Sequence, residues 1–169
     1  MKILKTTLLV AFVFAAFCTF AFAAEQGPYV VKSGGAKVLA LKLPKGCEAE
    51  VQGDKTIFAD RTQKPKFEFQ LWVIPGTKTV KDVVNGIGEV IKSEFLELKL
   101  KAVEDVKVAN GPGKLIVASG VEADDGDPGN AKILVFHKGK NVFVACVHGE
   151  GDYAATHYEA MLSMLKMAR

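Results

Sequence analysis

Four apolar stretches separated by three turns occupy the second half of the chain and restrict its possible folds. The apolar stretches are residues 98–108, 115–121, 133–137 and 142–148. The turns, rich in Gly, Pro, Asn and Asp, are residues 110–113, 124–130 and 138–141. Short connections of this kind join antiparallel neighbours, so the pattern predicts a four-stranded meander. Its last two strands lack polar alternation, which predicts that they are covered on both faces.

Further strands and two helices are expected around this meander. Alternating apolar residues predict strands at 38–43, 55–60 and 66–74, and the last of these turns apolar on its second face at Trp72 and Ile74. Helical spacing predicts helices over 80–95, opened by a Thr79 cap, and over 153–167. The order of elements predicts an α+β fold. We expect an antiparallel sheet of about six to seven strands with two main helices packed on it, as an α/β/α sandwich.

The first 23 residues have the three parts of a secretory signal peptide. Lys2 and Lys5 precede an apolar run over 8–18, and Ala21-Phe22-Ala23 supplies small residues at the cleavage site. We therefore expect cleavage after Ala23, a periplasmic or secreted protein, a leader over 24–35 and a single domain over 36–169. An uncleaved membrane anchor is the alternative, although the apolar stretch is shorter than the roughly 20 residues that span a bilayer.

Charge and length limit the possible functions. The 169 residues include 22 basic and 19 acidic residues, a net charge of +3. Cleavage after Ala23 removes two lysines and leaves a net charge of +1, so we expect no nucleic-acid partner. A mature chain of this length suits one domain with a core of its own.

The two cysteines of the expected mature chain leave two interpretations open. In an oxidising compartment, Cys47 and Cys146 can form one disulfide. Alternatively, both are buried free thiols.

The sequence has no common catalytic signature. It lacks the G-x-S-x-G, P-loop, H-E-x-x-H and C-x-x-C patterns, so we expect no catalytic residue and no cofactor. The strongest concentration of metal-ligand side chains is the loop from His148 to Asp152, which includes Glu150, with His157 in the following helix. These four residues could bind a transition metal, or the loop could simply cap the helix with Asp152.

Two groups of charged residues have functional and structural interpretations. Four acidic residues of one turn could bind calcium or be merely solvated; they are Glu122, Asp124, Asp125 and Asp127. Four lysines could contact an anionic partner or only keep a sheet edge solvated; they are Lys99, Lys101, Lys107 and Lys114.

The layout resembles the PsbP-like group, which includes the bacterial DcrB-type proteins. The similar parts are the exported leader, Leu41-Lys42-Leu43-Pro44-Lys45-Gly46, Val73-Ile74-Pro75 before a helix, the meander, and Leu162-Ser163-Met164-Leu165 in the last helix. This resemblance implies a sandwich without a catalytic centre. We therefore expect an exported non-enzymatic domain that binds a protein partner or a small ligand. The alternatives are a metal-dependent enzyme or metal-binding factor, and a membrane-anchored accessory subunit.

Overall fold

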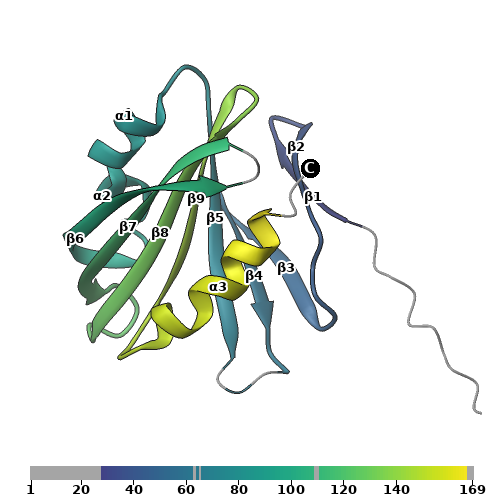
Figure 1. Cartoon of the computed structure of the whole chain (residues 1–169). Helices are drawn as coiled ribbons and strands as arrows, with labels where there is room; N and C mark the ends of the chain where they lie inside the picture. The colour runs from purple at the N-terminus through teal and green to yellow at the C-terminus, as the bar shows by residue number, and fades with distance from the viewer. Residues whose placement is uncertain (1–27, 63, 65, 109–110, 167–169) are drawn as a thin grey trace, which may run out of the picture.

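The chain folds as an α+β domain around a seven-stranded antiparallel sheet (Figure 1). The computed structural model describes residues 28–62, 64, 66–108 and 111–166. The expected signal peptide, the first four residues of the 24–35 leader, and the predicted helix end at Met167 lie outside these residues. The strand order is β3-β4-β5-β9-β8-β7-β6.

The predicted meander is confirmed and supplies more than half of this sheet. Its strands are β6 (Phe95–Val108), β7 (Gly111–Glu122), β8 (Pro128–Lys138) and β9 (Asn141–Gly149). All four strands are longer than expected. In β7 the extra residues are Gly111, Pro112 and Gly113, which belong to the strand and not to a turn. β9 lies between β8 and β5 near the middle of the sheet, which explains why its sequence is apolar on both faces.

The first half of the chain adds three strands to the sheet and a separate hairpin. The added strands are β3 (Cys47–Gln52), β4 (Lys55–Asp60) and β5 (Phe67–Pro75). The hairpin consists of β1 (Tyr29–Ser33) and β2 (Ala36–Leu41), which pair only with each other. The expected strand at 38–43 therefore exists but does not extend the main sheet, and β1 lies in the segment interpreted as a leader.

Two apolar clusters lie on opposite faces of the sheet. Alternate residues of β9 divide between them: Phe143, Ala145 and Val147 belong to one cluster, and Val142, Val144 and Cys146 to the other. The first cluster also includes Leu39 and Leu41 of the β1–β2 hairpin.

Three helices contribute side chains to these clusters. The helix α3 (Tyr153–Lys166) contributes Met161 and Leu165 to the first cluster, on the face that we call the α3 face (Figure 1). The helices α1 (Val80–Asn85) and α2 (Ile87–Val90) contribute Val83 and Ile87 to the second, on the α1/α2 face.

The continuous helix predicted over 80–95 is wrong. The capping box of Thr79 and Asp82 is present, but α1 ends at Gly86 and α2 is only one turn long. Glycine costs about 1 kcal/mol relative to alanine inside a helix. Gly86 lies between the two short helices and divides the segment, whereas Gly88 lies within α2.

The disulfide considered between Cys47 and Cys146 is not formed, and both thiols are free and buried. Cys47 belongs to the cluster on the α3 face, and Cys146 to the cluster on the α1/α2 face. The sheet therefore separates the two sulfur atoms. Among the described residues, no helix is both long enough and apolar enough to cross a membrane.

Candidate functional site

Four ionisable side chains far apart in the sequence meet on the α1/α2 face and form what we call the ion network: Lys55, Glu94, Glu122 and His148. Lys55 Nζ lies 2.5 Å from Glu94 Oε1, and His148 Nε2 lies 3.2 Å from Glu94 Oε2. His148 Nδ1 lies 3.1 Å from Glu122 Oε1. Two cations thus alternate with two carboxylates.

Strand ends and one turn position these groups. Lys55 opens β4, Glu122 closes β7, and His148 is the penultimate residue of β9. Glu94 ends the turn between α2 and β6, and its carbonyl oxygen accepts a hydrogen bond from Ala123 N at 2.9 Å. This backbone bond fixes the Glu94 turn beside the end of β7.

The geometry around His148 favours the protonated imidazole. Each ring nitrogen faces the carboxylate of a different residue, and only the imidazolium donates from both nitrogens. Burial by itself lowers the pKa of His148, but the hydrogen bonds to Glu94 and Glu122 outweigh it and the pKa is raised. The ring of Phe95 packs against the imidazole with the ring centroids 5.2 Å apart.

Glu94 is held in its ionised form although its side chain is only 8% exposed. Burial raises the pKa of a carboxyl group, but hydrogen bonds from His148, Lys55 and Ser93 outweigh it here and lower the pKa of Glu94 to about 2. A buried charge persists only when it is paired in this way. The pKa of the Cys146 thiol is raised, first by burial and second by the negative charges of Glu94 and Glu122. That thiol is therefore a poor nucleophile.

Two glycines make room for the network. Gly120 of β7 and Gly129 of β8 are cross-strand partners. A Cβ atom at Gly129 would overlap the carboxylate of Glu122. One at Gly120 would overlap the backbone carbonyl oxygen of Glu97 and approach the Phe95 ring to 2.6 Å. Glu122 therefore occupies the space beside Gly129, and the backbone of β6 together with Phe95 occupies the space beside Gly120.

The four residues considered as metal ligands are not gathered into one site. His148 lies on the α1/α2 face, whereas His157 packs between Phe67 and Tyr153 on the α3 face. Glu150 and Asp152 are exposed. Within the described part of the chain, no group of three or more ligand atoms within 4.8 Å of one another contains more than one of the four.

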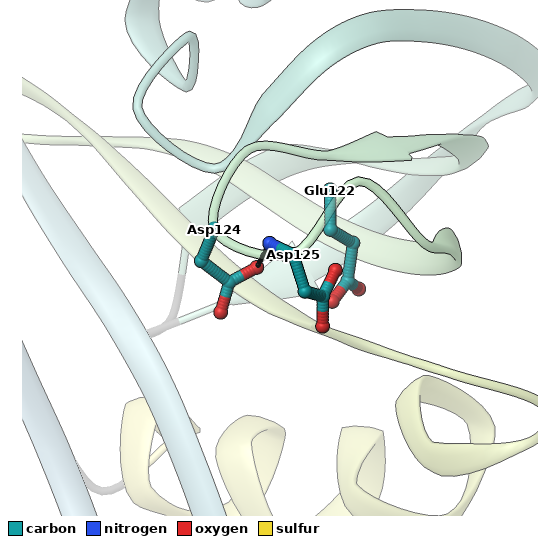
Figure 2. A group of neighbouring side chains, drawn as sticks. All are labelled: Glu122, Asp124 and Asp125. Carbon is teal, nitrogen blue, oxygen red and sulfur yellow. Dashed lines mark hydrogen bonds between the residues drawn. The ribbon is translucent and has the colours of Figure 1, made fainter.

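The acidic turn brings carboxylates together at the surface. Glu122, Asp124 and Asp125 have oxygens within 4.8 Å of one another (Figure 2). Asp125, Asp127 and Glu150 form a second such group. Asp125 N donates to Asp124 Oδ1 at 3.0 Å, and Asp127 N donates to Asp125 Oδ1 at 2.9 Å. Two of these carboxylates thus already shape the turn, while Glu122 binds His148.

A cleft of about 640 Å³ opens between β1 and the strands β3, β4 and β5, and we call it the hairpin cleft. Tyr29, Val30, Val51, Leu71 and Val73 give it apolar walls. Its polar lining residues are Lys32, Ser33, Asp54, Lys55 and Thr56. Lys55 therefore belongs to both the ion network and the hairpin cleft.

The sequence reasoning identified one member of the network, His148, and missed the other three as its partners. Glu94 and Glu122 lie 54 and 26 residues from His148 along the chain, whereas Glu150 and Asp152 are adjacent to it. One feature of the sequence could have indicated on which face of the sheet His148 lies. Alternation along β9 places His148 on the same face as Val144 and Cys146. That face is opposite to the one that α3 covers.

Comparison with known proteins shows the fold but no family. No family model matches the chain, and no curated protein matches it. The resemblance to the PsbP-like group therefore stays a prediction. A solved structure from Bacteroides thetaiotaomicron aligns with a TM-score of 0.51 and 10% identity, over 86% of this chain and 48% of that one. The chain thus spans about half of that protein.

Two other solved structures align over most of their own length. The protein of unknown function PA94 from Pseudomonas aeruginosa has a TM-score of 0.49 and 12% identity, over 84% of this chain and 96% of that one. LpqN, a protein involved in cell envelope biogenesis of Mycobacterium tuberculosis, has a TM-score of 0.49 and 12% identity, over 83% and 87%. At such identities a structural likeness concerns the fold alone.

Proposed function

We propose that this chain is an exported, non-enzymatic domain that binds a small amphipathic ligand in the hairpin cleft. The observation that carries the proposal is the cleft itself. Its volume of about 640 Å³ falls within the roughly 300–1,000 Å³ of small-molecule sites. Apolar walls with a few polar groups are the usual composition of such sites.

The lining favours an amphipathic ligand, and we propose that its head group is anionic and binds Lys32. The apolar side chains come from both the hairpin and the sheet, so an apolar ligand body would lie between them. Lys32 has no ion-pair or hydrogen-bond partner among the described residues, and its ammonium group is available to an anionic head group. Lys55 is already bound to Glu94.

One feature of the site supports binding in preference to catalysis. The acid and base groups of the ion network are buried and paired with one another, so they are poorly placed to exchange protons with a substrate.

The signal-like segment at 1–23 supports export, and mass spectrometry of the exported protein tests it. We expect a chain that begins at Ala24; a chain that retains residues 1–23 would support the membrane-anchored alternative.

The binding proposal can be tested with the amphipathic anion 1-anilinonaphthalene-8-sulfonate. The folded protein should bind it saturably at one site. Val73→Trp fills the cleft from β5 and should weaken binding by at least about tenfold. Val84→Trp is the matched control, because Val84 is also a half-buried valine but lies in α1 on the opposite face. Absence of saturable binding, or equal binding by both variants, would refute the cleft as the site.

A further inference from the structure

The strand β6 is a long edge strand with an unusual side-chain distribution. It bonds to β7 along one side, and no strand in the described part of the chain pairs with its other side (Figure 1). Of the large apolar side chains that are exposed among the described residues, three of four lie on it: Leu96, Leu100 and Val103, at 69%, 48% and 44% exposure. An exposed apolar edge strand is a template for pairing with another chain.

A bulge places two of these apolar side chains on the same face. The β6–β7 register shifts between Leu100 and Ala102, so Lys101 is the extra residue. Leu100 pairs with Ala118 and Val103 with Ile116, and both of these β7 residues belong to the α1/α2 cluster. In a regular strand, residues three positions apart face opposite sides. The bulge instead makes Leu100 and Val103 neighbours on one face.

We propose that two copies of this chain associate through β6, antiparallel, around a two-fold axis between Lys101 and Ala102. In this register Leu100 of each copy lies opposite Val103 of the other. The two-fold axis repeats the pair, so four apolar side chains meet on one face of the joined sheets. An interface of this kind is isologous and closes as a dimer.

Charge complementarity selects the same register. Lys99 of each copy lies opposite Glu104 of the other. Both side chains face the α3 side, because their β7 partners Ser119 and Leu115 alternate with Ala118 and Ile116. Both are exposed, and neither has an ion-pair or hydrogen-bond partner among the described residues. Opposite charges directly across an antiparallel pair are stabilising.

Neighbouring registers of the two β6 strands form less favourable residue pairs, and the lysines of β6 do not repel one another in the proposed register. A slide of two residues in one direction places Glu97 opposite Glu104. A slide in the other direction pairs Lys101 with Glu104 but loses the apolar contact, because Leu100 then lies opposite Asp105. In the proposed register no lysine of β6 faces another lysine, since Lys101 lies opposite Ala102 and Lys107 opposite Leu96. The lysines of this edge therefore do not block the proposed pairing.

Charge reversal tests the register directly. We expect light scattering after gel filtration of the processed chain to show a monomer–dimer equilibrium between about 1 and 200 µM protein. Lys99→Glu alone and Glu104→Lys alone should each weaken dimerisation by at least about tenfold, and the double variant should restore it. Lys81→Glu, an exposed charge reversal on α1, is the control and should leave the dimer unchanged.

Each departure from this pattern would overturn the proposal. A chain that stays monomeric up to the highest concentration does not use β6 for self-association. A dimer that is insensitive to the single reversals, or that the double variant does not restore, has another interface or register. Circular dichroism checks that the variants fold, which is expected because Lys99 and Glu104 are exposed in the single chain.

Discussion

Replacing Glu94 by glutamine tests the ion network most directly. The pKa of Glu94 is about 2, against an ordinary value near 4.5. This difference corresponds to about 3 kcal/mol of unfolding free energy, because one pKa unit is about 1.4 kcal/mol. Because the folded-state pKa is lowered, this stabilisation is complete above the ordinary pKa and is lost as the pH falls toward 2. Between about pH 5.5 and pH 3, Glu94 should account for a loss of about 2 kcal/mol.

Urea denaturation at these two pH values measures the effect, with the single tryptophan, Trp72, as a buried reporter. At the higher pH, Glu94→Gln should be less stable than the parent by about 3 kcal/mol, since Lys55 and His148 lose their shared carboxylate. The variant should also lose less stability on acidification than the parent, by about 2 kcal/mol.

Glu89→Gln makes the same chemical change at a surface position. The Glu89 side chain is 85% exposed and its carboxylate lies 3.7 Å from Lys92 Nζ, so its loss should change stability by less than about 0.5 kcal/mol at either pH. If Glu94→Gln keeps the full acid sensitivity of the parent, Glu94 is not held ionised and our account of the network fails.

Three further predictions concern the same region and the thiols. The pKa of His148 is raised in the folded state, so its protonation stabilises the fold. This stabilisation is complete below the ordinary histidine pKa and is lost as the pH rises through the raised value. His148→Gln should therefore flatten the dependence of unfolding free energy on pH above about pH 6.5. NMR titration of the parent should give a His148 pKa above that value, and an ordinary or lower pKa would contradict the geometry. Gly129→Ala should destabilise the fold by about 2–4 kcal/mol, because the new Cβ displaces Glu122. Gly88→Ala has open space around it and should stabilise α2 by up to about 1 kcal/mol. Similar melting temperatures for the two variants would contradict this. The processed chain, unfolded without reductant, should present two thiols to Ellman's reagent, and fewer would mean that Cys47 and Cys146 are bridged.

The sequence predicted the strands that have a strong apolar pattern and missed β3, whose pattern is weak. β5 and β9 have large apolar residues at alternate or successive positions, and both lie where the pattern placed them. β3 reads Cys-Glu-Ala-Glu-Val-Gln and is mostly exposed at the sheet edge, so little apolar burial marks it in the sequence. The helix over 80–95 was overextended because apolar spacing continues past Gly86, while the backbone does not.

The candidate site was less predictable, because its contacts depend on register between distant segments. Adjacency in the chain suggested that His148 acts with Glu150 and Asp152. The sheet instead brings His148 to Glu94 and Glu122, which follow a broken helix and end a strand. Neither carboxylate could be assigned to the imidazole before the order and register of β7, β8 and β9 were known.

The glycines show how the missing information was nevertheless present in the sequence. Gly120 and Gly129 lie on either side of the acidic turn, where glycine is common for conformational reasons alone. Once β7 and β8 are paired, the two glycines become cross-strand partners, although no positive φ angle requires either. Both positions lack space for a side chain: Glu122 fills the volume beside Gly129, and the Glu97 carbonyl oxygen and the Phe95 ring fill the volume beside Gly120. Facing glycines without a positive φ angle therefore indicate that other groups occupy that part of the sheet surface, and beside Gly129 that group is Glu122, which binds His148.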